Sequence, residues 1–97
     1  MIRHICMFKL LEENKQANLE QLLQRVQSLR TIPQVKHFEV QCNGEGLPES
    51  NYEVALIFDF ETIEDLNTYQ DHPDHRAFGA FIKEIRESRA CIDYYFD

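Results

Sequence analysis

The segment Tyr69-Gln70-Asp71-His72-Pro73-Asp74-His75 holds a phenol and two imidazoles within seven residues. An imidazole can accept or donate a proton near neutral pH, and a phenol can donate a hydrogen bond to a developing oxyanion. His4, in an apolar stretch near the N-terminus, could point into the same space. Acid–base chemistry is therefore one interpretation. In the other, His72 caps a helix, His75 is a solvated residue of the first turn, and Tyr69 is a core residue with a solvated hydroxyl.

Other reactive groups give weaker patterns. His72 and His75 could ligate a metal together with Asp71 or Asp74, but two histidines without an HExxH motif are too few, so we predict no metal site. No serine stands in a GxSxG motif, which argues against a serine hydrolase. We also predict no cofactor.

The composition excludes several partners. Among 97 residues, 10 Lys and Arg against 17 Asp and Glu give a net charge of −7. A chain with this balance has no basic stripe for DNA, RNA or an anionic membrane. The chain is also too short for more than one domain, so we expect a single domain over residues 1–97.

The cysteines predict free thiols rather than a disulfide framework. The chain has an odd number of cysteines, which lie far apart and form no CxxC pair: Cys6, Cys42 and Cys91. Each lies in a predicted strand, where a thiol behaves as a small hydrophobe. His4 and Cys6 share one strand face and suggest a Cys–His pair, but a buried thiol in an apolar strand is usually inert. With no signal-peptide core and no span-length apolar run, we expect a reduced, cytoplasmic protein.

The residues of interest must be positioned by strands and helices, which hydrophobic periodicity predicts. Strands are expected at residues 2–10, 35–42, 52–60 and 90–96, and helical regions at 15–29 and 62–89, the second broken at His72-Pro73. Thr62 and Asp65 resemble a capping box, and Pro73 suits the first position of a new helix. The order β-α-β-β-α-β predicts a ferredoxin-like α+β fold, with four antiparallel strands and the helices on one face.

This topology leaves one sheet face without helices. The strands are nevertheless apolar on both sides, since Ile5 and Met7 alternate with His4, Cys6 and Phe8. Soluble monomers rarely expose an apolar patch of several hundred Å². We therefore predict a homodimer in which two sheets pack face to face.

The sequence also resembles the stress-responsive A/B barrel domain (Dabb) family, one of the dimeric α/β barrel proteins. The resemblance covers nearly the whole chain. It rests mainly on the Tyr-x-x-His-Pro-x-His pattern of residues 69–75, supported by residues 2–9, 32–35, 38–40, 52–56 and 88–94.

The resemblance implies a ferredoxin-like dimer, and the function differs between the branches of this family. Most members have no established activity, some are stress-associated oligomers, and one branch comprises polyketide cyclases. By likeness to that branch, His75 would be the general base, Tyr69 would hold the oxyanion, and His4 would line the pocket. Val54 departs from the pattern, because the cyclases have a histidine there.

Three functions therefore remain open. The first is a binding module without catalysis, taking a small apolar carbonyl or aromatic compound between sheet and helices. The second is a cyclase-like lyase with His75 and Tyr69 as catalytic residues. The third is a cofactor-free monooxygenase like those on related barrels. For each of them we expect ligand contacts from His4, His72, Phe8, Leu23 and Phe81.

Overall fold

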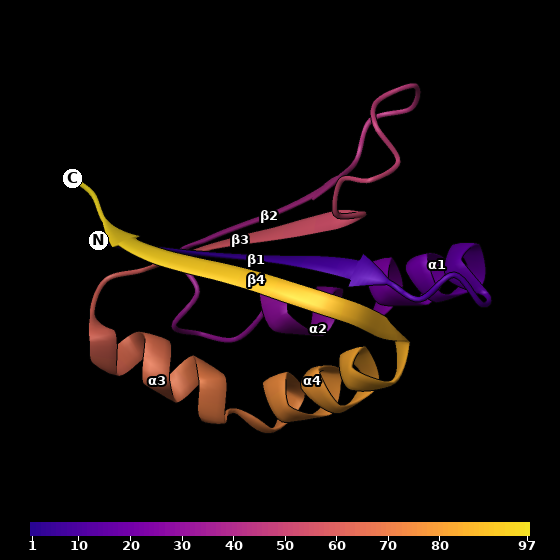
Figure 1. Ribbon diagram of the computed structural model, residues 1–97. Coiled ribbons are helices and arrows are strands. Elements are labelled where there is room, and N and C mark those ends of the chain that lie inside the picture. The colour runs from indigo at the N-terminus through magenta and orange to yellow at the C-terminus, as the bar shows by residue number, and fades with distance from the viewer.

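A computed structural model describes all residues, 1–97. Its four-stranded antiparallel sheet has the order β2-β3-β1-β4, and the helices cover one face (Figure 1). The predicted ferredoxin-like α+β fold is confirmed. The elements are β1 (Ile2–Leu10), α1 (Lys15–Arg25), α2 (Gln27–Arg30), β2 (His37–Cys42), β3 (Val54–Phe60), α3 (Ile63–Asp71), α4 (Pro73–Ile85) and β4 (Arg86–Tyr95).

The core lies between the sheet and the helices. Along β1, buried and partly buried residues alternate without exception, as expected for a strand whose neighbouring side chains point to opposite faces. His4, Cys6 and Phe8 point toward the helices, and Leu56 and Phe58 of β3 join them in the core. From the helices, Leu22, Val26 and Leu29 complete the packing and are almost fully buried.

The first helical region differs slightly from the prediction. It divides into α1 and α2 at Val26, where the amide of Leu29 bonds to the carbonyl of Val26 at 3.0 Å. Val26 keeps helical dihedral angles, so the apolar stripe continues across the break. Local hydrogen bonding changes there while the buried face does not.

The predicted caps of the second helical region are present. The Thr62 hydroxyl accepts a hydrogen bond from the amide of Asp65 at 3.1 Å, and α3 begins at the next residue after Thr62. Pro73 is the first residue of α4. The chain is extended at His72, between the two helices, because the residue before a proline disfavours the helical conformation.

The end of α4 was predicted wrongly. We expected helix to about residue 89, but α4 ends at Ile85 and β4 begins at Arg86 with no loop between them. Arg86 pairs with Leu10, and Arg89 pairs with Phe8. Long-range pairing with β1 therefore overrides the helical propensity of this charged stretch.

Two cysteines also correct the sequence analysis. Cys6 and Cys91 are direct partners in the β1–β4 register and form a disulfide, whereas we expected free thiols. Their separation of 85 residues hid this pairing from any local motif. Cys42 is free and exposed.

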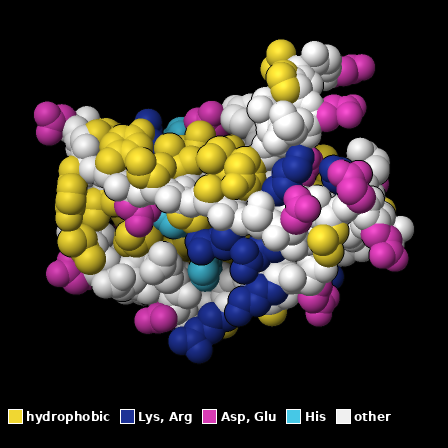
Figure 2. All heavy atoms as spheres, viewed as in Figure 1, with side chains coloured by type: hydrophobic (Ala, Val, Ile, Leu, Met, Phe, Trp, Pro, Cys, Tyr) yellow, Lys and Arg dark blue, Asp and Glu magenta, His cyan; other side chains and the backbone are white.

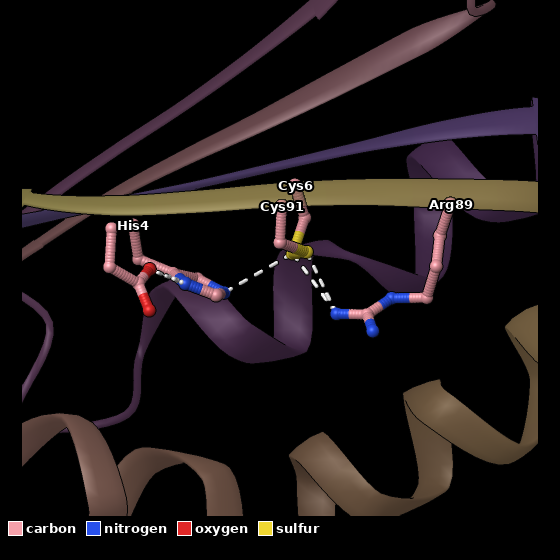
Figure 3. Close-up of a disulfide and its surroundings, with 5 residues drawn as sticks. His4, Cys6, Arg89 and Cys91 are labelled. Atoms are coloured by element: carbon pink, nitrogen blue, oxygen red, sulfur yellow. Dashed lines mark hydrogen bonds and ion pairs between the residues drawn. A yellow bond between two sulfur atoms is a disulfide. The ribbon is translucent and has the colours of Figure 1, made fainter.

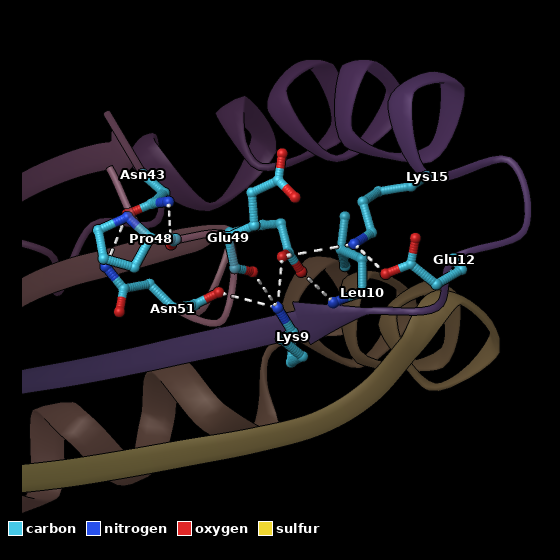
Figure 4. A network of polar contacts seen from close by, with 9 residues as sticks. Lys9, Leu10, Glu12, Lys15, Asn43, Pro48, Glu49 and Asn51 are labelled. Carbon is cyan, nitrogen blue, oxygen red and sulfur yellow. Dashed lines mark hydrogen bonds and ion pairs between the residues drawn. The ribbon is translucent and has the colours of Figure 1, made fainter. Parts of the chain in front are cut away.

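Polar contacts tie the β2–β3 loop to the end of β1 (Figure 4). Lys9 Nζ donates to the backbone carbonyls of Glu49 and Asn51, and to Glu53 Oε2 at 2.9 Å. The other oxygen of Glu53 accepts from the backbone amide of Leu10 at 2.6 Å. A single lysine thus fixes where the hairpin loop meets the rest of the sheet.

The sheet face opposite the helices is apolar and uncovered within one chain. Figure 2 shows hydrophobic side chains gathered on that side of the molecule. Ile5, Met7 and Ile57 are only partly buried there, and Ile92 and Tyr94 are 60% and 39% exposed. No helix of the structure is long and apolar enough to cross a membrane.

Candidate functional site

A cavity of about 210 Å³ lies between the sheet and helices α3 and α4. Phe8, Leu56, Phe58, Phe78 and Ile82 form much of its apolar wall. His4, Tyr69 and His75 also line it. Residues from β1, α3 and α4 therefore meet around one space, in the region where the sequence analysis expected a pocket.

Tyr69 and His75 form the closest pair among these polar groups. Their ring centroids are 4.7 Å apart, in an edge-on arrangement at 60°. Tyr69 lies in the last turn of α3 and His75 in the first turn of α4. The break at His72-Pro73 turns the chain between them, so both side chains reach the cavity.

The His75 ring is held by one hydrogen bond to the backbone. Its Nδ1 lies 3.0 Å from the carbonyl oxygen of Gln70. Since a carbonyl oxygen can only accept, Nδ1 carries the proton and Nε2 is left with a lone pair when the ring is neutral. His75 is half-buried rather than solvated.

The electrostatic surroundings favour that neutral ring. Burial lowers the pKa of His75, the Gln70 carbonyl opposes this shift, and the nearby His4 and Arg89 lower the pKa further. A neutral imidazole near pH 7 can accept a proton.

Tyr69 combines a buried ring with a hydroxyl that has no hydrogen-bond partner in the protein. The residue is 2% exposed, and its ring packs against Phe58 and Phe60. No fully buried side-chain oxygen or nitrogen is left unsatisfied, so the hydroxyl opens into the cavity that Tyr69 lines. Burial raises the pKa of Tyr69, which keeps the hydroxyl protonated as a donor.

His4 is almost fully buried and is held from two sides. Its Nδ1 contacts the carboxylate of Asp93 on β4, and its Nε2 lies 3.3 Å from the sulfur of Cys6. The His4 ring is 6.5 Å from the Tyr69 ring, measured between centroids. His4 therefore belongs to the cavity wall, and Asp93 fixes its orientation.

Cationic side chains form part of the cavity lining. Lys83 and Arg86, at the junction of α4 and β4, and Arg89 of β4 all contribute to the lining. Figure 2 shows Lys and Arg side chains gathered beside a histidine in this region. In a chain of net charge −7, this gathering of positive charge favours an anionic group on the ligand.

Three residues that the sequence analysis expected to contact a ligand lie outside this cavity. His72 caps α4, because its Nδ1 accepts from the amide of Asp74 at 3.1 Å. Leu23 is partly buried against the core, and the ring of Phe81 lies under the guanidinium of Arg25, at 4.2 Å. None of the three lines the cavity, whereas Phe8 does. His72 and His75 also hold separate backbone partners, so nothing draws them together as metal ligands.

Sequence reasoning missed Arg89 and Asp93. Both lie on β4, whose start was misplaced, and neither stands in a recognisable motif. The one available signal was the alternation of β4, which puts residues 89, 91 and 93 on the same face as Phe8, Cys6 and His4.

Comparison with known structures agrees with this fold. A dimeric ferredoxin-like protein of unknown function from Thermobifida fusca is 30% identical, with a TM-score of 0.88 over 98% of this chain and 90% of that one. A dimeric protein of unknown function from Bacteroides fragilis is 32% identical, with a TM-score of 0.84 over 98% and 95%. Both relatives are described as dimers, and neither has an assigned activity.

A third similar structure is an enzyme. The hydroxynitrile lyase of Passiflora edulis has a TM-score of 0.84 over 99% of this chain and 93% of its own, at 17% identity. At that identity the likeness concerns the fold alone. No curated protein sequence matches the chain.

The sequence pattern described as the stress responsive A/B barrel domain matches residues 2–96. The sheet order and the helix positions agree with the ferredoxin-like fold of the similar structures. The chain belongs to the stress responsive A/B barrel domain family.

Proposed function

We propose that this protein is a homodimer that binds a small molecule in the cavity between sheet and helices. The ligand has an apolar or aromatic body and a carbonyl or carboxylate group. The single observation that carries this proposal is the lining of the cavity, which combines apolar walls with the polar side chains of His4, Tyr69, His75 and Arg89.

The size of the cavity limits the ligand. Pockets for drug-sized molecules usually measure roughly 300–1,000 Å³, and this one measures about 210 Å³. A single aromatic ring with one polar substituent suits that space. Tyr69 can donate a hydrogen bond to the polar substituent, and Arg89 can pair with a carboxylate.

Benzoate and acetophenone test this, because they share a ring and differ in the polar group. We expect both to shift the NMR signals of cavity residues, and benzoate to bind more tightly. Tyr69→Phe should weaken binding roughly tenfold, the loss of about one hydrogen bond to a polar or charged group. Tyr95→Phe is the matched control, since Tyr95 lies outside the cavity and is 72% exposed. Equal losses in both variants, or no shift with either compound, would contradict the proposal.

A second function is favoured by the hydrogen bond between His75 and the Gln70 carbonyl. It leaves the lone pair on Nε2 as a base beside the Tyr69 hydroxyl. His75 Nε2 would take a proton from the carbon next to a carbonyl group, and Tyr69 would hydrogen-bond the enolate oxygen. This is the chemistry of a lyase or cyclase.

Hydrogen–deuterium exchange on a model ketone measures this proton removal, and the natural substrate need not be known. We expect the protein to speed the exchange of the methyl protons of acetophenone for deuterium in D₂O. His75→Ala should abolish the acceleration, and Tyr69→Phe should reduce it by roughly a hundredfold, as for loss of an oxyanion donor. If wild-type protein binds acetophenone but leaves its exchange rate unchanged, the binding function stands and the lyase function fails.

The dimer and the location belong to the same proposal. The uncovered apolar face carries Ile5, Met7, Ile57 and Ile92, and the two similar structures at 30% and 32% identity are described as dimeric. A second copy on this face would remove it from water. We also propose a cytoplasmic location.

A further inference from the structure

The floor of the cavity includes the disulfide between β1 and β4. Cys6 is buried on the central strand β1 and lines the cavity, whereas Cys91 lies on the edge strand β4 and is exposed. The two sulfur atoms therefore differ in access. A small thiol can reach Cys91 from the edge of the sheet without opening the core.

Two polar side chains, His4 and Arg89, flank this disulfide (Figure 3). His4 Nε2 lies 3.3 Å from Cys6 Sγ, and the carboxylate of Asp93 contacts the Nδ1 of His4. From the other side, Arg89 Nη2 lies 2.8 Å from Cys91 Sγ and 3.6 Å from Cys6 Sγ. Asp93, His4 and Cys6 thus stand in the order carboxylate, imidazole and thiol.

This arrangement suits a thiolate better than a structural disulfide. A guanidinium beside sulfur stabilises its anion, and the carboxylate of Asp93 orients the imidazole of His4 toward Cys6 Sγ. His4, Cys6 and Cys91 also place three donor atoms within 4.8 Å, as a metal site would. The guanidinium of Arg89 against both sulfurs opposes a cation there.

We propose that Cys6 and Cys91 form a redox-active dithiol–disulfide centre that exchanges with small thiols and disulfides. A thiolate of the external thiol attacks Cys91 Sγ, forming a mixed disulfide with Cys91 and breaking the Cys6–Cys91 bond. Cys6 leaves as a thiolate between Arg89 and His4, and it takes up a proton from solvent. A second external thiolate then attacks the sulfur of the bound thiol. It releases the external disulfide and leaves Cys91 as a thiolate.

The reverse direction oxidises the protein. The Cys91 thiolate attacks an external disulfide, one external thiolate leaves, and the Cys6 thiolate then attacks Cys91 Sγ and releases the second. Two electrons and the two protons of the dithiol pass to the external disulfide. In the cytoplasm, where we place this protein, the rare disulfides are usually transient and either catalytic or redox-sensing.

Intact-mass measurement after alkylation of free thiols tests the centre. Oxidised wild-type protein should take one alkyl group, at Cys42, and protein reduced with dithiothreitol should take three. The Cys42→Ser variant should take no alkyl group when oxidised and two when reduced, and its disulfide should exchange with glutathione at the wild-type rate. With glutathione, the native disulfide should open at least tenfold faster than the same disulfide in protein unfolded by urea, where His4, Asp93 and Arg89 no longer surround it.

Variants separate the roles of the neighbours. Arg89→Gln and Asp93→Asn should each slow exchange about tenfold at an unchanged melting temperature, and Asp93→Glu should restore most of the rate. In Cys6→Ser, oxidised glutathione should leave a stable mixed disulfide on Cys91, because no thiol remains beside Cys91 to displace it. Any one of three results would overturn the proposal. The first is alkylation of all three cysteines without reductant, and the second is exchange that is no faster in the native than in the unfolded chain. The third is exchange at the wild-type rate in both Arg89→Gln and Asp93→Asn.

Discussion

Among single residues, the histidines of this molecule have different structural roles. His72 and His75 are three residues apart, yet His72 caps a helix through Nδ1 while His75 lines a cavity. The difference comes from the backbone at Pro73, which starts a new helix between them and turns the two rings toward different surroundings. His4 differs again, because a carboxylate from β4 and a sulfur on its own strand hold it.

The protonation of His75 is testable by NMR. Burial lowers its pKa, so the folded protein binds fewer protons than the unfolded chain in the range just below pH 6.5. Stability should therefore be full above about pH 6.5, the pKa of an unperturbed histidine, and decrease as the pH falls toward the folded pKa. We expect the titration midpoint of the His75 ring protons to lie below about 6.5, the pKa of an unperturbed histidine. A His75 midpoint above about 6.5 would contradict the neutral base assigned here.

At the scale of elements, the break between α3 and α4 shapes the site. It ends α3 just after Tyr69 and begins α4 just before His75, which brings their rings to 4.7 Å. A continuous helix would carry the two residues six positions apart, on different faces. The cap at His72 is thus part of what positions the site.

Variants of His72 distinguish a capping role from a ligand contact. His72→Ala should lower the free energy of unfolding by about 1 kcal/mol, as for loss of a helix N-cap, and His72→Asn should retain most of it. Urea denaturation measures this. Benzoate affinity of the folded variants should stay within about twofold of wild type, since His72 does not line the cavity. A tenfold loss of affinity in His72→Asn at wild-type stability would show that His72 contacts the ligand.

In the molecule as a whole, helices cover one face of the sheet, and the other face is uncovered within one chain. The helix face supplies the core and the cavity, and the opposite face carries Ile5, Met7, Ile57 and Ile92. A chain of this length buries only about 60–65% of its unfolded surface, so a second copy adds a large share of its apolar burial.

Ile92→Asp should disrupt the proposed dimer, because it would place a carboxylate in an apolar interface without a partner. We expect analytical ultracentrifugation at low micromolar concentration to give a dimer for wild type and mainly monomer, with a lower melting temperature, for the variant. Ile63→Asp is the matched control, since Ile63 is 50% exposed and lies in the helical layer. A wild-type monomer, or a dimer that survives Ile92→Asp, would contradict the predicted interface.

Much of the fold could be predicted from local patterns. Alternation assigned His4, Cys6 and Phe8 to the helix face, and Thr62 and Pro73 marked the helix starts, because periodicity and capping depend on neighbouring residues. The choice of Tyr69, His75 and His4 as candidates followed from residue type and from family resemblance. Local residue patterns were therefore enough to predict the order of the elements, the face of each strand and the chemistry carried by a few positions.

Contacts between residues far apart in the chain could not be predicted in this way, because they depend on how the strands pair. The pairing of β1 with β4 ended α4 at Ile85, joined Cys6 to Cys91, and brought Asp93 to His4 and Arg89 to the cavity. A shift of one residue in that register would send each β4 side chain to the opposite face. Register is set by packing over the whole sheet, so no stretch of the sequence encodes these contacts on its own.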